Sequence, residues 1–188
     1  MRVIAGSARR LILTTPRGNN TRPTSDKIKE TLFNILAPDL YGAAFLDLFA
    51  GSGGIGIEAL SRGADSCTFI EKDRAAVGCI RKNLETTHFT DKAVVYPYDV
   101  LTYLHDLHPL RCFDIVFMDP PYDKGIEKNV LTILSRSDII DKDTLVITEA
   151  SADTSFDDVE DIGFEVIRIK SYKNNKHVFL KLKTNGGQ

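Results

Sequence analysis

From residue 43 onward the chain alternates short apolar segments with stretches of helical periodicity, and this alternation restricts the fold more than any other feature. The expected strands are 44–49, 68–71, 93–96, 114–118, 145–149, 165–170 and 177–182. The expected helices between the first five strands are 55–62, 74–88, 100–105 and 126–135. Apolar strands that alternate with helices predict an α/β fold with a mostly parallel seven-stranded sheet covered on both faces. Because only residues 171–176 separate the last two strands, we expect these two strands to pair as an antiparallel hairpin.

The residues before this alternation predict a small extension. Apolar segments at 3–4 and 10–14 indicate an N-terminal β-hairpin, and the turn-rich stretch 16–23 marks a boundary. Thr24 or Ser25 is then expected to cap a helix. A length of 188 residues allows one well-buried core and excludes two full-sized domains. We therefore expect a basic hairpin extension over 1–23 and one main domain over 24–188.

Composition narrows the class of protein. Hydrophobic residues make up 43% and charged residues 27% of the chain, as in ordinary globular proteins. No segment has the length of a membrane span, and Arg2, Arg9 and Arg10 interrupt the N-terminal apolar residues, which argues against a signal peptide. A cytoplasmic location without membrane contact is the expectation. The three cysteines and four histidines show no metal-ligand spacing, so we expect no metal, and we expect the histidines at the surface or at helix ends.

The charge is concentrated at the two chain ends. Residues 1–29 hold seven basic groups against the single acid Asp26, and residues 166–188 hold six basic groups and no acid, although the whole chain has a net charge of -2. Such segregation indicates a cationic surface, built from both ends, that attracts phosphates. Solvated faces of terminal strands are the alternative, and charge alone does not decide between the two.

A glycine-rich turn follows the first strand, as Asp47-Leu48-Phe49-Ala50-Gly51-Ser52-Gly53-Gly54-Ile55-Gly56. In an open parallel sheet such a turn binds a ligand, because backbone amides and a helix N-terminus face the crevice. Its G-x-G-x-x-G spacing also fits a dinucleotide site or a structural turn. Asp47 would repel a pyrophosphate and suits a ligand with an ammonium group, such as S-adenosylmethionine. Glu71 is placed to accept both ribose hydroxyls, with a surface acid at a strand end as the alternative. Asp99 is placed to accept from an adenine amino group or to cap the next helix.

The tetrapeptide Asp119-Pro120-Pro121-Tyr122 directly follows the strand 114–118. Consecutive prolines restrict the backbone and hold this loop rigid. The amino nitrogen of a purine is a poor nucleophile, and the Asp119 carboxylate with the Pro120 carbonyl can bind its two hydrogens and orient it. Tyr122 can stack on a base turned out of its stack. The sequence predicts a catalytic loop here, with a plain turn as the alternative.

With these residues, the chain resembles the class I, Rossmann-like methyltransferases, and more narrowly the bacterial small-subunit ribosomal RNA guanine-N2 methyltransferases of the RsmD type. The likeness covers nearly the whole chain and rests on the runs 22–34, 47–53 with 58–64, and 119–122. It implies S-adenosylmethionine as methyl donor and a guanine amino group of 16S ribosomal RNA as target. It also implies a small-subunit assembly intermediate as the true substrate, and we expect a monomer.

Carried over position by position, the resemblance assigns three groups of residues. The catalytic residues are Asp119, Pro120, Pro121 and Tyr122. The cofactor-binding residues are Asp47, Phe49, Ala50, Gly51, Ser52, Gly53, Glu71, Lys72, Asp99 and Val100. The RNA-binding residues are Arg2, Arg9, Arg10, Arg22, Pro23 and Thr24. The chain departs from the family pattern at residues 5–8, where Ala5-Gly6-Ser7-Ala8 replaces an expected Gly-Gly and a bulky residue, so RNA contact by the hairpin is less firmly implied.

Four other functions fit part of the pattern. A DNA adenine-N6 methyltransferase, or another RNA adenine methyltransferase, uses the same loops, but a DNA enzyme needs a target-recognition segment for which this chain has no room. A protein-glutamine methyltransferase is expected to carry Asn at position 119. A nicotinamide-dependent oxidoreductase lacks a hydride-transfer partner here. A noncatalytic RNA-binding module would bind RNA without transferring a methyl group.

Overall fold

The computed structural model describes residues 1–16, 25–106, 112–121 and 125–184. These residues fall into two compact units, Met1–Val100 and Leu101–Gln188, which are described in turn.

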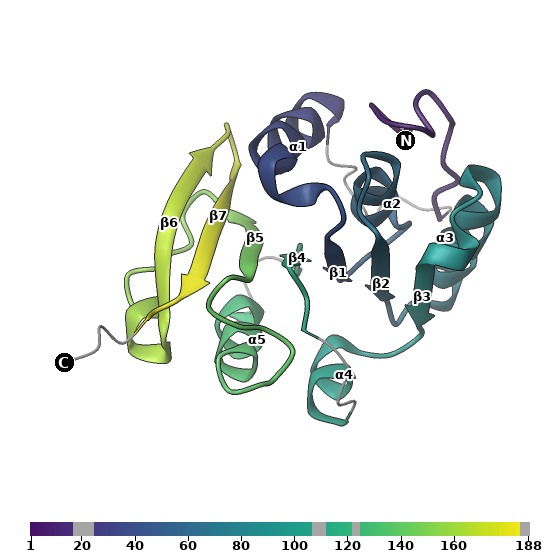
Figure 1. Cartoon of the computed structure of the whole chain (residues 1–188). Helices are drawn as coiled ribbons and strands as arrows, with labels where there is room; N and C mark the ends of the chain where they lie inside the picture. Colours follow the sequence, from purple (N-terminus) through teal and green to yellow (C-terminus); the bar gives the residue numbers. More distant parts are fainter. Residues whose placement is uncertain (17–24, 107–111, 122–124, 185–188) are drawn as a thin grey trace. The chain divides into compact units, whose positions relative to one another are not determined.

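The first unit is a three-stranded parallel sheet with helices (Figure 1). Its strands are β1 (Ala44–Leu48), β2 (Ser66–Ile70) and β3 (Ala93–Tyr96), in the order β3-β2-β1. Its helices are α1 (Asp26–Leu40), α2 (Gly54–Ser61), α3 (Arg74–Thr87) and the 3₁₀ turn η1 (Thr90–Lys92). Helix α2 packs on β1 and β2, and α3 packs on β3. All five residues of β1 are buried, which is why this strand is apolar throughout apart from Asp47.

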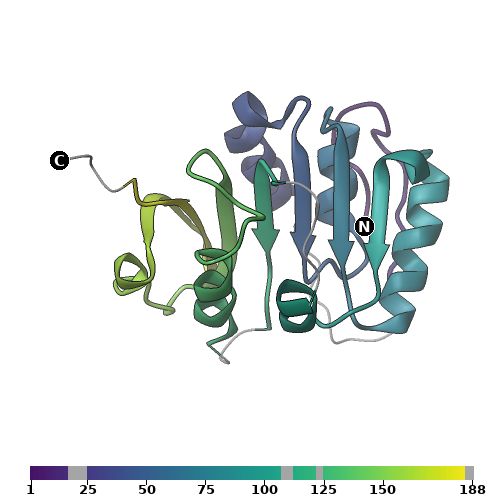
Figure 2. The same cartoon turned by 60° about the horizontal axis from the view of Figure 1, so that its bottom comes forward.

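The second unit contains the other four strands. They are β4 (Ile115–Met118), β5 (Leu145–Ser151), β6 (Phe164–Ser171) and β7 (Asn175–Leu182), in the order β4-β5-β7-β6. Strands β4 and β5 are parallel, whereas β7 is antiparallel to both β5 and β6. Helix α4 (Val100–Asp106) begins at the boundary between the units, and α5 (Ile126–Leu134) and the 3₁₀ turn η2 (Val159–Ile162) complete the second unit (Figure 2). The seven strands and the antiparallel terminal pair confirm the predicted α/β class.

Local sequence explains where α1 begins. Ser25 is its N-cap, and the Ser25 hydroxyl accepts a hydrogen bond from the Ile28 amide at 3.3 Å. Leu32, Phe33 and Leu36 form its buried side. Of the two caps that the sequence offered, Ser25 is the one used, while Thr24 lies outside the described residues.

The N-terminal extension differs in detail from the predicted hairpin. Its two sides are joined by one isolated antiparallel bridge, Arg2 with Ile12, and by backbone hydrogen bonds such as Val3 to Leu11. Within the part of the chain that the structure describes, no helix is long and apolar enough to cross a membrane.

Candidate functional site

The loop after β1 has an unusual backbone. Phe49, Gly51 and Gly53 have φ values of 62°, 53° and 79°, and α2 begins at the next residue, Gly54. Glycine adopts such angles without strain, whereas at Phe49 a positive φ costs on the order of 1–3 kcal/mol. The Gly53 amide donates to the Ala50 carbonyl at 2.8 Å, and the Ala50 amide donates to the Ile70 carbonyl at 3.0 Å. The loop is therefore a compact turn tied to β2.

Asp47 lies in β1, just before this loop, and has 2% of its surface exposed. Its Oδ2 atom accepts a hydrogen bond from the Gly56 amide at 2.9 Å, in the first turn of α2. Burial raises the pKa of the Asp47 carboxyl from 3.8 to about 7, only partly opposed by that amide, and the nearby Glu71 carboxylate adds to the rise. A cationic ligand group would favour the ionised form of Asp47, and an anionic one would oppose it.

Glu71, directly after β2, holds the same loop from the other side. Its Oε2 atom accepts from the Gly51 amide and its Oε1 atom accepts from the Asp73 amide, both at 2.8 Å. A carboxylate has roughly four acceptor positions, so each oxygen keeps one free for a ligand hydroxyl. Glu71 thus organises the loop and can still accept hydrogen bonds from a ribose.

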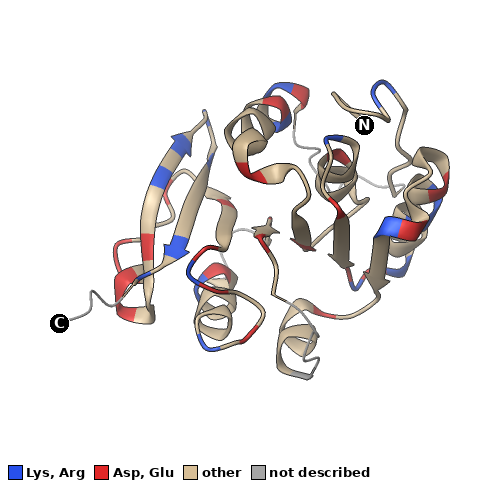
Figure 3. Ribbon diagram, in the orientation of Figure 1, with Lys and Arg blue, Asp and Glu red and all other residues tan. Residues whose placement is uncertain are grey.

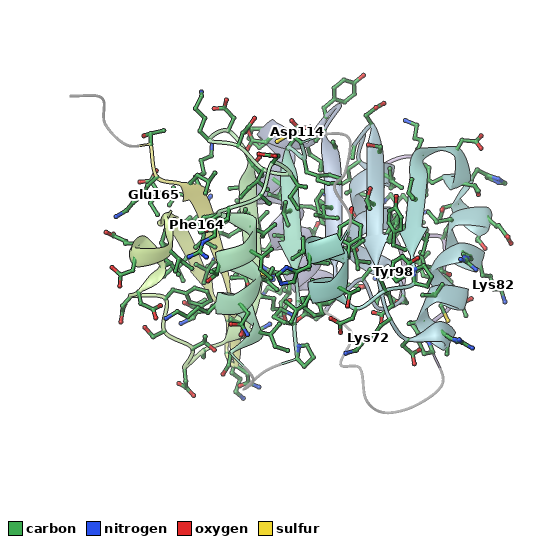
Figure 4. The ribbon with its side chains drawn as sticks, turned by 90° about the horizontal axis from the view of Figure 1, so that it is seen from below. Lys72, Lys82, Tyr98, Asp114, Phe164 and Glu165 are labelled. Atoms are coloured by element: carbon green, nitrogen blue, oxygen red, sulfur yellow. The ribbon has the colours of Figure 1, made fainter. Side chains whose placement is uncertain are left out.

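The residues after β2 and β3 lie close together. Lys72 forms an ion pair with Asp99 at 3.0 Å, and both side chains are well exposed. Figure 4 shows Lys72 and Tyr98 near the ends of these strands. Asp99 immediately precedes α4, whose first residue, Val100, is buried. The ten predicted cofactor residues therefore lie near the carboxyl ends of three neighbouring strands: Asp47 within the end of β1, the others in the loop after β1, directly after β2, or between β3 and the first residue of α4.

The predicted catalytic loop belongs to the second unit. Asp119 directly follows β4 and is half-buried, Pro120 is buried and Pro121 is exposed, while Tyr122 lies outside the described residues. β4 pairs with β5 up to Met118 and Thr148, so Asp119 and Glu149 each follow this last pair.

A buried polar cluster on β5 and β7 was not predicted. The expectation that His177 lies at the surface or a helix end was wrong, because this side chain is in β7 and fully buried. Its Nε2 atom lies 3.1 Å from Glu149 Oε2, and its Nδ1 atom lies 3.3 Å from the Tyr172 hydroxyl. Asn175 donates to the other Glu149 oxygen. The hydrogen bond to Glu149 is what allows a histidine to be buried between strands.

The predicted RNA-binding residues are described in part. Arg9 and Arg10 are exposed, and Arg2 pairs with Asp26 at 2.8 Å. Figure 3 shows the basic residues of the N-terminal loop in blue. Arg22, Pro23 and Thr24 lie outside the described residues. Lys29 was wrongly counted with the surface cations: it is 1% exposed, and its Nζ atom lies 3.2 Å from Glu58 Oε2. Burial lowers the Lys29 pKa, and the Glu58 carboxylate opposes that shift.

The run Glu58 to Ala64 anchors the N-terminal extension, a role that sequence reasoning missed. The two Glu58 oxygens accept from the Ile4 and Ala5 amides at 2.8 and 3.0 Å. The Ser61 hydroxyl donates to the Ala5 carbonyl at 2.6 Å. A Cβ atom at Gly6 would lie 1.8 Å from the Ser61 carbonyl oxygen, so only glycine fits this contact. A charged residue within the otherwise apolar stretch 54–60 was the available signal.

Known proteins resemble most of the chain. The family model described as conserved hypothetical protein 95 matches residues 1–181. A relative named "Putative rRNA methyltransferase YlbH", from Bacillus subtilis, is 41% identical over 79% of this chain and 82% of its own length. "Ribosomal RNA small subunit methyltransferase D" from Escherichia coli K12 is 37% identical over 81% of this chain and 76% of its own length.

Solved structures share the fold. The "Putative methyltransferase yhhF" from Escherichia coli has a TM-score of 0.85 and 31% identity, covering 98% of this chain and 99% of its own. A more distant one, "SMU.776, a putative methyltransferase complexed with SAH", has a TM-score of 0.63 and 16% identity, covering 82% of this chain and 49% of its own. At that identity the likeness concerns the fold alone.

Proposed function

This chain belongs to the conserved hypothetical protein 95 family, and on that premise we propose that it transfers a methyl group from S-adenosylmethionine to the exocyclic N2 amino group of a guanine in 16S ribosomal RNA. The names of its relatives support an rRNA methyltransferase. The small-subunit assembly intermediate, rather than free RNA, is the proposed substrate, and the protein acts as a monomer.

The observation that carries the proposal is the loop after β1, held between two carboxylates. Asp47 accepts a hydrogen bond from the Gly56 amide of α2, and Glu71 accepts one from the Gly51 amide. Acidic groups therefore flank the glycine turn. A pyrophosphate would meet unfavourable charge there, whereas the ammonium group and the ribose hydroxyls of S-adenosylmethionine suit such acceptors. Asp99, paired with Lys72, is the proposed acceptor for the adenine amino group.

When bound, the cofactor supplies an electrophilic methyl group on a sulfonium. In the proposed reaction the Asp119 carboxylate and the Pro120 carbonyl accept hydrogen bonds from the two hydrogens of the guanine amino group. Those bonds fix the orientation of the nitrogen toward the methyl group, and the Tyr122 ring stacks on the base.

The proposal is tested with labelled S-adenosylmethionine and undermethylated small ribosomal subunits, followed by nucleoside mapping of the product. We expect the label in N2-methylguanosine and weaker labelling of protein-free 16S RNA. Label in N6-methyladenosine would instead support the adenine-specific alternative. Calorimetry that detected NAD binding and no S-adenosylmethionine binding would support the oxidoreductase.

The catalytic assignment has its own test. We expect Asp119→Ala to abolish methyl transfer while the affinity for S-adenosylmethionine stays nearly unchanged, because Asp119 acts on the base. Asp143→Ala is a suitable control, since Asp143 is an exposed acid of the same unit whose side chain is 76% accessible. Near-normal turnover by the Asp119 variant would exclude the proposed role.

A further inference from the structure

Asn83, in the middle of the hydrophilic helix α3, is 1% exposed. Its Oδ1 atom accepts from the Thr14 amide at 2.7 Å, and its Nδ2 atom donates to the Thr14 carbonyl at 2.8 Å. The same Nδ2 atom donates to the Ser52 carbonyl at 2.9 Å. One carboxamide therefore satisfies both backbone groups of Thr14 and one backbone group of the glycine loop. Asparagine is a weak helix former, so these tertiary bonds, not helix propensity, account for its presence.

The bond to Ser52 fixes one peptide plane of the loop. The Ser52 carbonyl and the Gly53 amide belong to the same planar unit, and the Gly53 amide donates to Ala50 on the opposite side. A rotation of this peptide would break both bonds. Glu71 holds Gly51 in a similar way, so two side chains from outside the loop determine its conformation.

The bonds to Thr14 fix the end of the N-terminal extension. The Leu13 amide donates to the Met1 carbonyl, and the extension is anchored at its other side by Glu58 and Ser61. Arg9 and Arg10, the exposed basic residues proposed for RNA contact, lie between these two anchor points. Displacement of Thr14 would therefore release one side of that basic loop.

We infer that Asn83 is a positioning residue that couples the N-terminal extension to the cofactor loop, so that each ligand stabilises the arrangement the other needs. The inference rests on the proposed function, since it takes the loop as the cofactor site and the extension as an RNA contact. Asn83 acts through Ser52 and Thr14 and touches neither ligand. Coupling between two binding sites is reciprocal, so any effect of cofactor on RNA affinity implies an equal effect of RNA on cofactor affinity.

The test is amide hydrogen exchange at Thr14, measured with and without S-adenosylhomocysteine. In the wild type we expect the ligand to slow exchange at Thr14 by roughly 5-fold or more, the lower end of ordinary coupling energies. In Asn83→Ala we expect the Thr14 amide to exchange faster both with and without ligand. The ratio of its exchange rates without and with saturating ligand should fall to about 1. Lys82→Ala is the control, because this exposed neighbour on α3, labelled in Figure 4, should keep the wild-type ratio.

A second variant guards against simple unfolding of the alanine protein. Asn83→Asp keeps an acceptor for the Thr14 amide and loses the donor to both the Ser52 and the Thr14 carbonyls, so it too should lose the ligand effect while the Thr14 amide stays partly protected. The inference would be overturned if S-adenosylhomocysteine slowed exchange at Thr14 equally in the wild type and in both variants. It would also be overturned if the wild type bound this ligand without any change in exchange at Thr14. Failure of the wild type to bind S-adenosylhomocysteine at all would instead count against the proposed function.

Discussion

Two helical glycines show how strongly a single position depends on its surroundings. A Cβ atom at Gly56 would lie 2.3 Å from Phe69 and 2.5 Å from Cys67, both buried in β2, whereas a Cβ atom at Gly78 would meet nothing within 4 Å. We expect Gly56→Ala to lower the free energy of unfolding by about 1–3 kcal/mol through overpacking. Gly78→Ala should raise it by about 0.5–1 kcal/mol, because alanine favours an exposed helix. Urea unfolding of both variants measures the difference, and equal effects would exclude the close packing at Gly56.

Asp47 predicts a pH dependence of stability. Its pKa rises from 3.8 to about 7 on folding, so the folded state keeps a proton that the unfolded state releases between these pH values. The associated stability is complete below pH 3.8 and is lost as the pH rises to about 7, a change of up to about 4 kcal/mol. Asp47→Asn cannot titrate, so its stability relative to the wild type should increase across this range. The measurement is urea unfolding of both proteins from pH 4.5 to 8, and parallel pH profiles would contradict the shifted pKa.

The positions of the acidic residues around the loop after β1 were predictable, and their hydrogen bonds were not. The glycine pattern and the strand ends located Asp47, Glu71 and Asp99 because parallel strands bring their carboxyl ends to one edge. The sequence assigned the Glu71 carboxylate to ribose hydroxyls, and it gave no sign that this carboxylate accepts from the Gly51 amide. Asn83 escaped notice because its partners Thr14 and Ser52 are 69 and 31 residues away. Such contacts depend on tertiary packing, which the local periodicity of the sequence does not report.

At the level of elements, α1, α2 and the N-terminal extension meet at one buried ion cluster. Glu58 is fully buried, pairs with Lys29 and with Arg62, and accepts two amides of the extension. Breaking a buried pair leaves an uncompensated charge, so we expect Glu58→Gln to lower the free energy of unfolding by about 3–5 kcal/mol. The exposed pair of Lys142 with Asp143 is the control, and Lys142→Gln should change stability by less than about 0.5 kcal/mol. A small effect at Glu58, measured by urea unfolding, would show that the cluster contributes little.

The same cluster explains why the extension is less regular than its sequence suggested. Strands and helices of the main domain were predicted to within about two residues, because apolar periodicity extends over whole elements there. In the extension, Glu58 takes the amides of Ile4 and Ala5, which a regular hairpin would direct to the opposing strand. Ser61 takes the Ala8 amide in the same way. Side chains from α2 thus accept hydrogen bonds that strand pairing would otherwise satisfy. The sequence of the extension alone does not reveal these partners.

For the whole molecule, the net charge of -2 conceals a strongly basic N-terminus. Not every cation there is available to a polyanion: Lys29 is neutralised in the core by Glu58, and Arg2 pairs with Asp26. Arg9 and Arg10 are exposed, and no ion pair of theirs occurs among the salt bridges of the described residues. These two residues are therefore the strongest candidates for phosphate contacts in the described part of the extension.

If Arg9 and Arg10 contact phosphates, removing their charges should change the salt dependence of RNA binding as well as its affinity. Each neutralised phosphate releases counterions, so the slope of log K against log salt falls by about 0.7–0.9 for each phosphate that a variant no longer neutralises. Charge reversal at Arg9, Arg10 and Arg22 should weaken RNA binding and flatten this slope, whereas reversal at the exposed Arg136 and Lys142 should weaken binding only through net charge and leave the slope nearly unchanged. Filter binding at several salt concentrations distinguishes the two sets. An unchanged slope in the N-terminal variant would show that the extension does not contact RNA phosphates. The loss of long-range attraction lowers the affinity, but it does not change the number of phosphates that the protein neutralises.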